Sequence, residues 1–130
     1  MPSLDHISLN VSDFDAAKAF YLATLKPLGI GLVMELPKAV TGSCDFAGLG
    51  ADGKPFFWLS STGQATPGVH VAFAADSRAE VDAFYAAAIA TGGRDNGKRG
   101  IRAQYHPTSY GAFVLDADGN NVEAVCHKAE

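Results

Sequence analysis

Three side chains of types that commonly bind divalent metals occupy related positions in this sequence: His6, His70 and Glu123. The histidines lie 64 positions apart, and each falls in a segment where every second residue is hydrophobic. In a β-strand this alternation puts the imidazoles on the face opposite the hydrophobic side chains, and Glu123 takes the same face of a later strand. Two imidazoles and one carboxylate can hold a cation from one side and leave positions open for substrate and water. The sequence therefore predicts a metal centre, although a lone histidine or glutamate is more often structural or solvated.

The segment of residues 97–110 combines cations, tyrosines and a histidine, and it could contact a substrate. Guanidinium and phenol groups bind anionic or oxygen-rich molecules, so Arg102, Tyr105 and Tyr110 are candidate substrate-binding residues. His106 is the candidate catalytic residue, because an imidazole can act as an acid or a base near neutral pH. The alternative interpretation is a solvated loop whose tyrosines cover the core.

Aromatic residues 56–58 belong to a predicted strand whose side chains alternate between two faces, so at least one ring faces the predicted cavity. We assign Phe57 to the pocket, where it would favour a partly apolar substrate, and core packing is the competing interpretation. His127 shares the face of Glu123 by the same alternation. Because it lies close to the C-terminus, where chains are often poorly ordered, we give it little weight as a functional residue.

The matching positions of the two histidines reflect an internal repeat. When the chain is shifted by 64 positions along itself, the segment that begins at His6 falls on the one that begins at His70, and Ala19-Phe20-Tyr21 falls on Ala83-Phe84-Tyr85. Each copy contains an apolar strand, a helix that ends at glycine, and further strands, which is the pattern of a duplicated unit. We expect one domain of two modules: module 1 at about residues 1–63 and module 2 at about residues 64–130.

Capping residues mark the ends of the predicted helices. The first helix begins near residues 12–13, and the second begins at Ser77, which forms a capping box with Glu80. Gly29 and the pair at 92–93 provide the helix ends. The first strand of each module contains its histidine, at residues 4–11 in module 1, and the other strands are predicted at residues 31–36, 44–50, 55–61, 99–105, 111–116 and 121–127. Hairpin turns are predicted at residues 52–53 and 118–119.

These elements predict an α+β fold of two tandem βαβββ modules, whose mixed sheets form a cup-shaped half-barrel with the helices on the outside. In such a cup the two histidines point into the shared concave space, and the late carboxylate joins them. The site would therefore lie inside the cup.

Composition excludes several classes of function. The net charge of −4 argues against a general binder of nucleic acid or acidic membranes. No apolar run approaches the roughly 18 residues of a membrane span, and the N-terminal residues lack the pattern of a secretory signal. Cys44 and Cys126 form no C-x-x-C pair, so we expect a reducing compartment and a cytoplasmic location.

Three segments resemble the vicinal oxygen chelate superfamily, which includes glyoxalase I, bleomycin-resistance proteins, fosfomycin-resistance thiol transferases and extradiol dioxygenases. The segments are residues 4–13, 68–73 and 113–125, and the resemblance extends over essentially the whole chain. It implies that His6, His70 and Glu123 bind one divalent metal ion (Mn, Fe, Ni or Zn). It also implies a homodimer, since members of the family pair modules within or between chains.

One position departs from glyoxalase I, which has a fourth ligand on the last strand of its first module. The repeat puts Phe57 there, and phenylalanine cannot bind a metal, which favours the three-ligand pattern of the dioxygenase and fosfomycin branches. We expect a glyoxalase- or dioxygenase-like enzyme that chelates two neighbouring oxygens of a small substrate, for which an anionic molecule is a candidate, with lyase, isomerase or oxygenase chemistry. The alternative is a metal-free binding protein of the bleomycin-resistance type, with an aromatic or cationic compound in the same cup.

Overall fold

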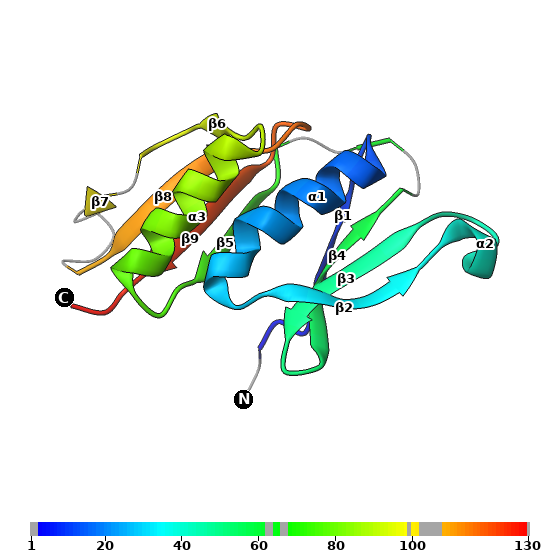
Figure 1. The fold of residues 1–130 in the computed structure, drawn as a ribbon, viewed down its shortest axis with the longest axis horizontal. Coiled ribbons are helices and arrows are strands. Elements are labelled where there is room, and N and C mark those ends of the chain that lie inside the picture. Colours follow the sequence, from blue (N-terminus) through cyan, green and yellow to red (C-terminus); the bar gives the residue numbers. More distant parts are fainter. Residues whose placement is uncertain (1–2, 62–63, 66–67, 99, 102–107, 130) are drawn as a thin grey trace.

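A computed structural model describes residues 3–61, 64–65, 68–98, 100–101 and 108–129. The chain forms two βαβββ modules in succession, and Figure 1 shows α1 and α3 side by side over the sheets. Module 1 contains β1 (Ile7–Asn10), α1 (Phe14–Leu25), a short 3-10 turn (Lys26–Leu28), β2 (Gly31–Leu36), α2 (Lys38–Thr41), β3 (Phe46–Ala51) and β4 (Lys54–Ser60). Module 2 contains β5 (His70–Ala74), α3 (Arg78–Ala90), β6 (Arg94–Asp95), β7 (Gly100–Ile101), β8 (Tyr110–Leu115) and β9 (Asn121–Cys126).

Each module has its own open, mixed sheet. The strand order is β1-β4-β3-β2 in module 1 and β5-β9-β8-β6 in module 2, where β7 also pairs with β8. The first strand of each module runs parallel to the last one, and the other pairs are antiparallel. The predicted α+β fold with two mixed sheets is therefore confirmed.

The helices begin where the capping residues predicted. The Asp13 carboxylate accepts a hydrogen bond from the backbone N–H of Ala16, and the Ser77 hydroxyl accepts one from the N–H of Glu80. These bonds satisfy N–H groups that have no partner within the helix. Gly29, with a φ of 79°, ends the turn that follows α1, because a left-handed backbone costs glycine little. None of the helices in the described part of the chain has the length and hydrophobicity needed to cross a bilayer.

A shared core joins the two modules. The ring of Phe57 on β4 lies edge-on to Tyr21 on α1 and to Phe73 on β5, at centroid distances of 5.0 and 5.2 Å. The Tyr21 hydroxyl donates a hydrogen bond to the buried carboxylate of Asp116, in the turn between β8 and β9. Burial and the Asp116 carboxylate raise the pKa of Tyr21 well above its usual range. The two modules are thus connected by aromatic packing and by one buried polar contact.

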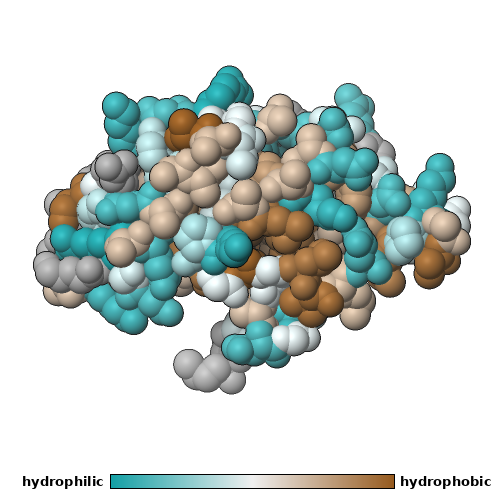
Figure 2. Space-filling model, in the orientation of Figure 1, coloured by the Kyte–Doolittle hydropathy of each residue, from teal (hydrophilic) through white to brown (hydrophobic). Residues whose placement is uncertain are grey.

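The helices and strands differ from the prediction in two places. The strand expected at residues 99–105 is represented by two short pieces, of which β6 begins at Arg94 and β7 covers Gly100–Ile101, and residues 102–105 lie outside the described residues. The short helix α2 was not predicted at all, because four residues are too few to show helical periodicity. Apolar side chains reach the surface on β2 and at α2 (Figure 2), at Leu32, Met34 and Val40.

Candidate metal centre

His70 and Glu123 lie together on the face of the module 2 sheet opposite α3. β5 and β9 run parallel, with Ala72 beside Glu123, so both side chains project from the same face of neighbouring strands. His70 Nε2 and Glu123 Oε1 form a hydrogen bond of 2.9 Å, so the proton between them has to leave before both atoms can bind one metal ion. Glu123 is 8% exposed, whereas the His70 side chain is half exposed. The pair borders a hollow of about 310 Å³, which we call the module 2 hollow and which is lined by His70, Ala72, Ser109, Phe113, Glu123, Val125 and His127.

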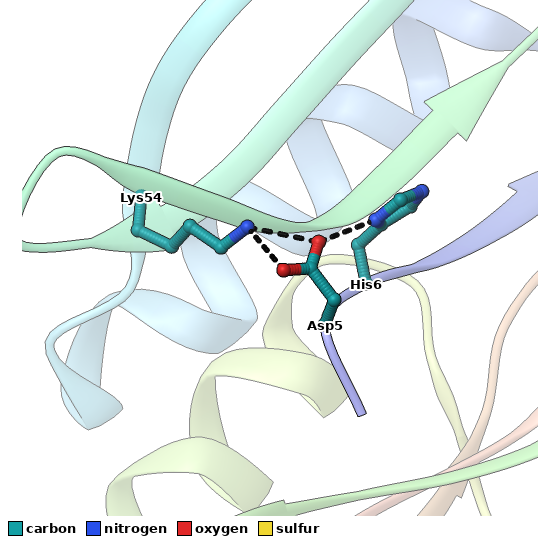
Figure 3. Close-up of polar contacts among 3 residues, drawn as sticks. All are labelled: Asp5, His6 and Lys54. Carbon is teal, nitrogen blue, oxygen red and sulfur yellow. Dashed lines mark hydrogen bonds and ion pairs between the residues drawn. The ribbon is translucent and has the colours of Figure 1, made fainter. Parts of the chain in front are cut away.

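His6 stands immediately before β1 and is held by a carboxylate of its own. Its Nδ1 lies 2.7 Å from Asp5 Oδ1, and both Asp5 oxygens accept hydrogen bonds of 2.9 Å from Lys54 Nζ, as Figure 3 shows. The hydrogen bond from His6, followed by the contacts with Lys54, lowers the pKa of Asp5. Since an ionised carboxylate only accepts hydrogen bonds, His6 Nδ1 carries the proton and Nε2 is the nitrogen that can bind a metal. His6 borders the module 1 hollow, of about 250 Å³, together with Ser8, Leu36, Phe46 and Trp58.

The donor groups fit a divalent cation, but one chain does not bring all three together. Neighbouring ligands of an octahedral ion with bonds of about 2.1 Å lie about 3 Å apart, close to the separation of His70 Nε2 from Glu123 Oε1. Within the residues that the structure describes, however, no three His, Cys, Asp or Glu side chains form a group able to hold a metal ion. His6 and the His70–Glu123 pair border different hollows.

A third, largely apolar cleft of about 320 Å³ separates β1 from β5. Ile7 from β1 and Val71 and Phe73 from β5 are among the residues that line it. Each of the two strands is at the edge of its sheet, and in the described sheets neither pairs with the other. The first strands of the two modules therefore keep one side open for further contacts.

Of the residues predicted from segment 97–110 to bind or convert the substrate, the described part of the chain includes Tyr110, which does not line the two hollows. Arg102, Tyr105 and His106 lie outside the described residues. Tyr110 projects toward α3, where its hydroxyl donates a 2.6 Å hydrogen bond to Asp82. Phe113, an odd number of positions along the same strand, takes the face of the module 2 hollow instead. The structure thus does not bring Tyr110 to the His70–Glu123 pair.

Phe57 is 1% exposed and packs in the core, where it also borders the apolar cleft between β1 and β5. The alignment that placed it opposite Glu123 is wrong by one residue. Ser8 and Ala72 each follow their histidine by two positions, and they pair with Trp58 and Glu123 respectively. Trp58 is therefore the counterpart of Glu123. The error comes from an irregularity in β4, where the pairing with β3 shifts register by one residue. An alignment made at the two hairpin turns cannot show that shift.

Two further residues line the hollows but are not among the site residues predicted from the sequence. Trp58 borders the module 1 hollow, and the alternation of faces along residues 56–58 was the signal for it. His127 borders the module 2 hollow, as its parity with Glu123 indicated. Its Nδ1 is 2.9 Å from the hydroxyl of buried Ser109, and its backbone carbonyl accepts a 2.6 Å hydrogen bond from Thr108. These contacts hold His127 in place although it lies near the C-terminus.

Comparison with known proteins gives a family and several structural relatives. Residues 3–124 match the Glyoxalase/Bleomycin resistance protein/Dioxygenase superfamily. A glyoxalase/bleomycin resistance protein from Albidiferax ferrireducens T118 is 30% identical with a TM-score of 0.75, and the match covers 94% of this chain and 96% of that one. No curated protein matches.

Two more distant structures share the fold. Glyoxalase I from Zea mays is 20% identical with a TM-score of 0.72, and the match covers 98% of this chain and 45% of that chain. A mutant of the fosfomycin resistance protein FosX from Listeria monocytogenes, complexed with Mn(II) and 1S,2S-dihydroxypropylphosphonic acid, is 17% identical with a TM-score of 0.69. That match covers 95% of this chain and 91% of FosX.

Proposed function

Because the chain belongs to the Glyoxalase/Bleomycin resistance protein/Dioxygenase superfamily, we propose that it is a metal-dependent enzyme that binds a small organic substrate through two neighbouring oxygens. The observation that carries this proposal is the His70–Glu123 pair, whose Nε2 and Oε1 atoms lie 2.9 Å apart in a hollow. His6, with its Nδ1 on Asp5, is the proposed third ligand. FosX, which shares the fold, was crystallised with Mn(II) and a dihydroxy compound, and this supports the same type of chemistry here.

The full ligand set is proposed to form between two copies of the chain. His6 borders the module 1 hollow and also the apolar cleft, whereas His70 and Glu123 border the module 2 hollow, so each chain offers two partial sites. In a two-fold dimer, any contact between module 1 of one copy and module 2 of the other occurs twice. Such pairing would bring His6 of one copy to His70 and Glu123 of the second, and it would make two equivalent sites. The open edges of β1 and β5, on either side of an apolar cleft, are suited to this pairing.

We call the site formed by His6 of one copy with His70 and Glu123 of the other the composite site, and each residue in and around it has a proposed role. A bound divalent ion, for which Mn, Fe, Ni and Zn are candidates, would polarise the two substrate oxygens and stabilise negative charge on them. Asp5 keeps the proton of His6 on Nδ1, and Glu123 supplies the negative charge that neutral imidazoles lack. His127, held at Nδ1 by Ser109, is the described residue best placed to move a proton at the rim of the module 2 hollow. Phe113 and Val125 exclude water beside it.

The proposal is tested by metal analysis of the purified protein and of mixed dimers. Wild-type protein, reconstituted with Mn(II) or Zn(II), should bind one ion per chain and sediment as a dimer. His6→Ala and Glu123→Ala chains should each bind no metal. When the two variants are refolded together, mixed dimers should regain one intact site, since one composite site carries both substitutions and the other carries neither.

Each result of this experiment decides a separate point. Asp76→Asn, which alters an exposed acid paired with Lys128 at 3.6 Å, is the control and should bind metal like wild type. If wild-type protein binds the ion as a monomer, or if the mixture regains nothing, the composite site is refuted. If the wild type takes up no metal but still binds small molecules, the protein belongs to the metal-free binding class instead.

A further inference from the structure

The module 1 hollow has an aromatic wall built around the only tryptophan of the chain. Trp58 lies over Gly48 on the neighbouring strand β3, and the two residues are paired in the sheet. A Cβ atom at position 48 would lie 2.8 Å from Trp58 Cη2 and 2.9 Å from Cζ2, closer than real contacts allow. Gly48 therefore allows the Trp58 indole to pack flat against β3.

This wall stands beside a proposed metal ligand. Trp58 pairs with Ser8, two residues after His6, and all three line the same hollow. The other residues of that hollow, Leu36 and Phe46, are apolar. Since Trp58 occupies the position that Glu123 occupies in module 2, an apolar ring replaces a carboxylate next to the site.

We propose that Trp58 is a specificity-determining residue, which selects substrates whose two chelating oxygens adjoin a planar, unsaturated group. This inference rests on the proposed function and narrows its substrate class. A planar group held against the indole gains an aromatic contact in addition to the burial of its apolar surface. A saturated group of the same size gains the burial but not the ring contact. A second carboxylate at this position would instead bind the cation and would exclude an apolar ring.

Two hydroxamates test the proposal, because they chelate metal through the same pair of oxygens. Benzohydroxamate carries a planar ring, and cyclohexanecarbohydroxamate carries a saturated ring of similar size. Calorimetric titration of Zn(II)-loaded wild-type protein should show benzohydroxamate binding about tenfold more tightly, the ratio that an aromatic contact in the upper part of its usual range gives. Quenching of the fluorescence of Trp58 should follow the same titration, since the chain has no other tryptophan.

Variants then test whether Trp58 causes the preference for the planar ring. Trp58→Leu should bind Zn(II) as wild type does and bind both hydroxamates equally, while Trp58→Phe should keep most of the preference. Gly48→Ala should also lose the preference, because the added methyl displaces the indole. Gly31→Ala is the matched control on β2, where an added Cβ meets nothing within 4 Å, and it should behave as wild type.

The outcomes separate this inference from the proposed function. If wild-type protein binds Zn(II) but shows no ring preference, or if Trp58→Leu keeps that preference, the role of Trp58 is refuted and the metal centre stands. If the wild type binds no metal, the proposed function fails. In that case the role of Trp58 is tested by titrating the metal-free protein with benzamide and cyclohexanecarboxamide. Equal affinities for the two compounds would refute the role of Trp58. A preference for benzamide that is lost in Trp58→Leu would support it.

Discussion

The contact between Asp5 and His6 gives a direct prediction about metal affinity. Asp5→Asn replaces a carboxylate, which only accepts hydrogen bonds, by an amide that can also donate one. His6 Nδ1 then no longer has to carry the proton, so the ring can bear it on Nε2, the atom that would bind the metal. The variant also removes the negative charge that makes the imidazole a stronger ligand. We expect weaker metal binding and an unchanged fold.

The magnitude follows from the geometry of this contact. Carboxylates that support a ligating histidine typically contribute 10- to 100-fold in metal affinity. The Asp5 side chain is 68% exposed and is shared with Lys54, so solvent weakens its effect on His6. We therefore expect a loss of about tenfold, at the lower end of that range. Lys54→Met leaves the bond to His6 in place and should cost about threefold or less.

Competition with a chromophoric chelator at pH 7 measures both effects. Asp76→Asn again serves as the control, because it alters an exposed acid with a lysine partner but without a ligand histidine beside it. Circular dichroism and the unfolding temperature should match wild type in all three variants. The reasoning is refuted if Asp5→Asn binds Zn(II) as tightly as wild type while the control also behaves normally. It is likewise refuted if Lys54→Met is the more damaging of the two.

Three further predictions concern neighbouring contacts. Trp58→Glu should tighten Zn(II) binding by about tenfold in the same competition assay, because it adds a carboxylate ligand; unchanged affinity would contradict its assigned position. Tyr21→Phe should lower the unfolding free energy by about 2 kcal/mol in urea titrations, since buried Asp116 loses a hydrogen bond. The raised pKa of Tyr21 means that its contribution is complete below pH 10 and falls as the pH rises above that value, so this alkaline loss should be absent in the variant. Ser109→Ala should shift the Nδ1 resonance of His127 in nitrogen NMR spectra without changing Zn(II) content, and an unmoved resonance would disprove their contact.

The fold could be predicted because the repeat and the capping residues act locally. Asp13 and Ser77 cap the helices through bonds to residues three positions away, which a sequence shows directly. Alternation along β9 correctly placed Glu123 and His127 on one face, since that strand pairs with β8 without a break. Short-range rules therefore gave the elements and the direction of most side chains.

The site could be predicted only in part, because it depends on pairing between distant residues. A shift of one residue between β3 and β4 exchanges the faces of Phe57 and Trp58, and nothing local in the sequence marks it. The separation of His6 from His70 and Glu123 depends on how the two modules pack. That packing involves Tyr21 with Asp116 and Phe57 with Phe73, contacts that no periodicity reveals.

The repeat has diverged in a way that makes the two modules complementary. In module 2 the histidine lies beside a carboxylate from the last strand, Glu123, whereas in module 1 that position is Trp58 and the carboxylate is Asp5, bound to the other side of the ring. Module 2 thus offers two of the proposed ligands, and module 1 offers the third proposed ligand and an apolar wall. Pairing two copies of module 1 would leave the site without a ligating carboxylate, and pairing two copies of module 2 would place two carboxylates together. Only the unlike pairing gives two imidazoles, one carboxylate and an apolar surface, and the proposed two-fold dimer would form that pairing twice.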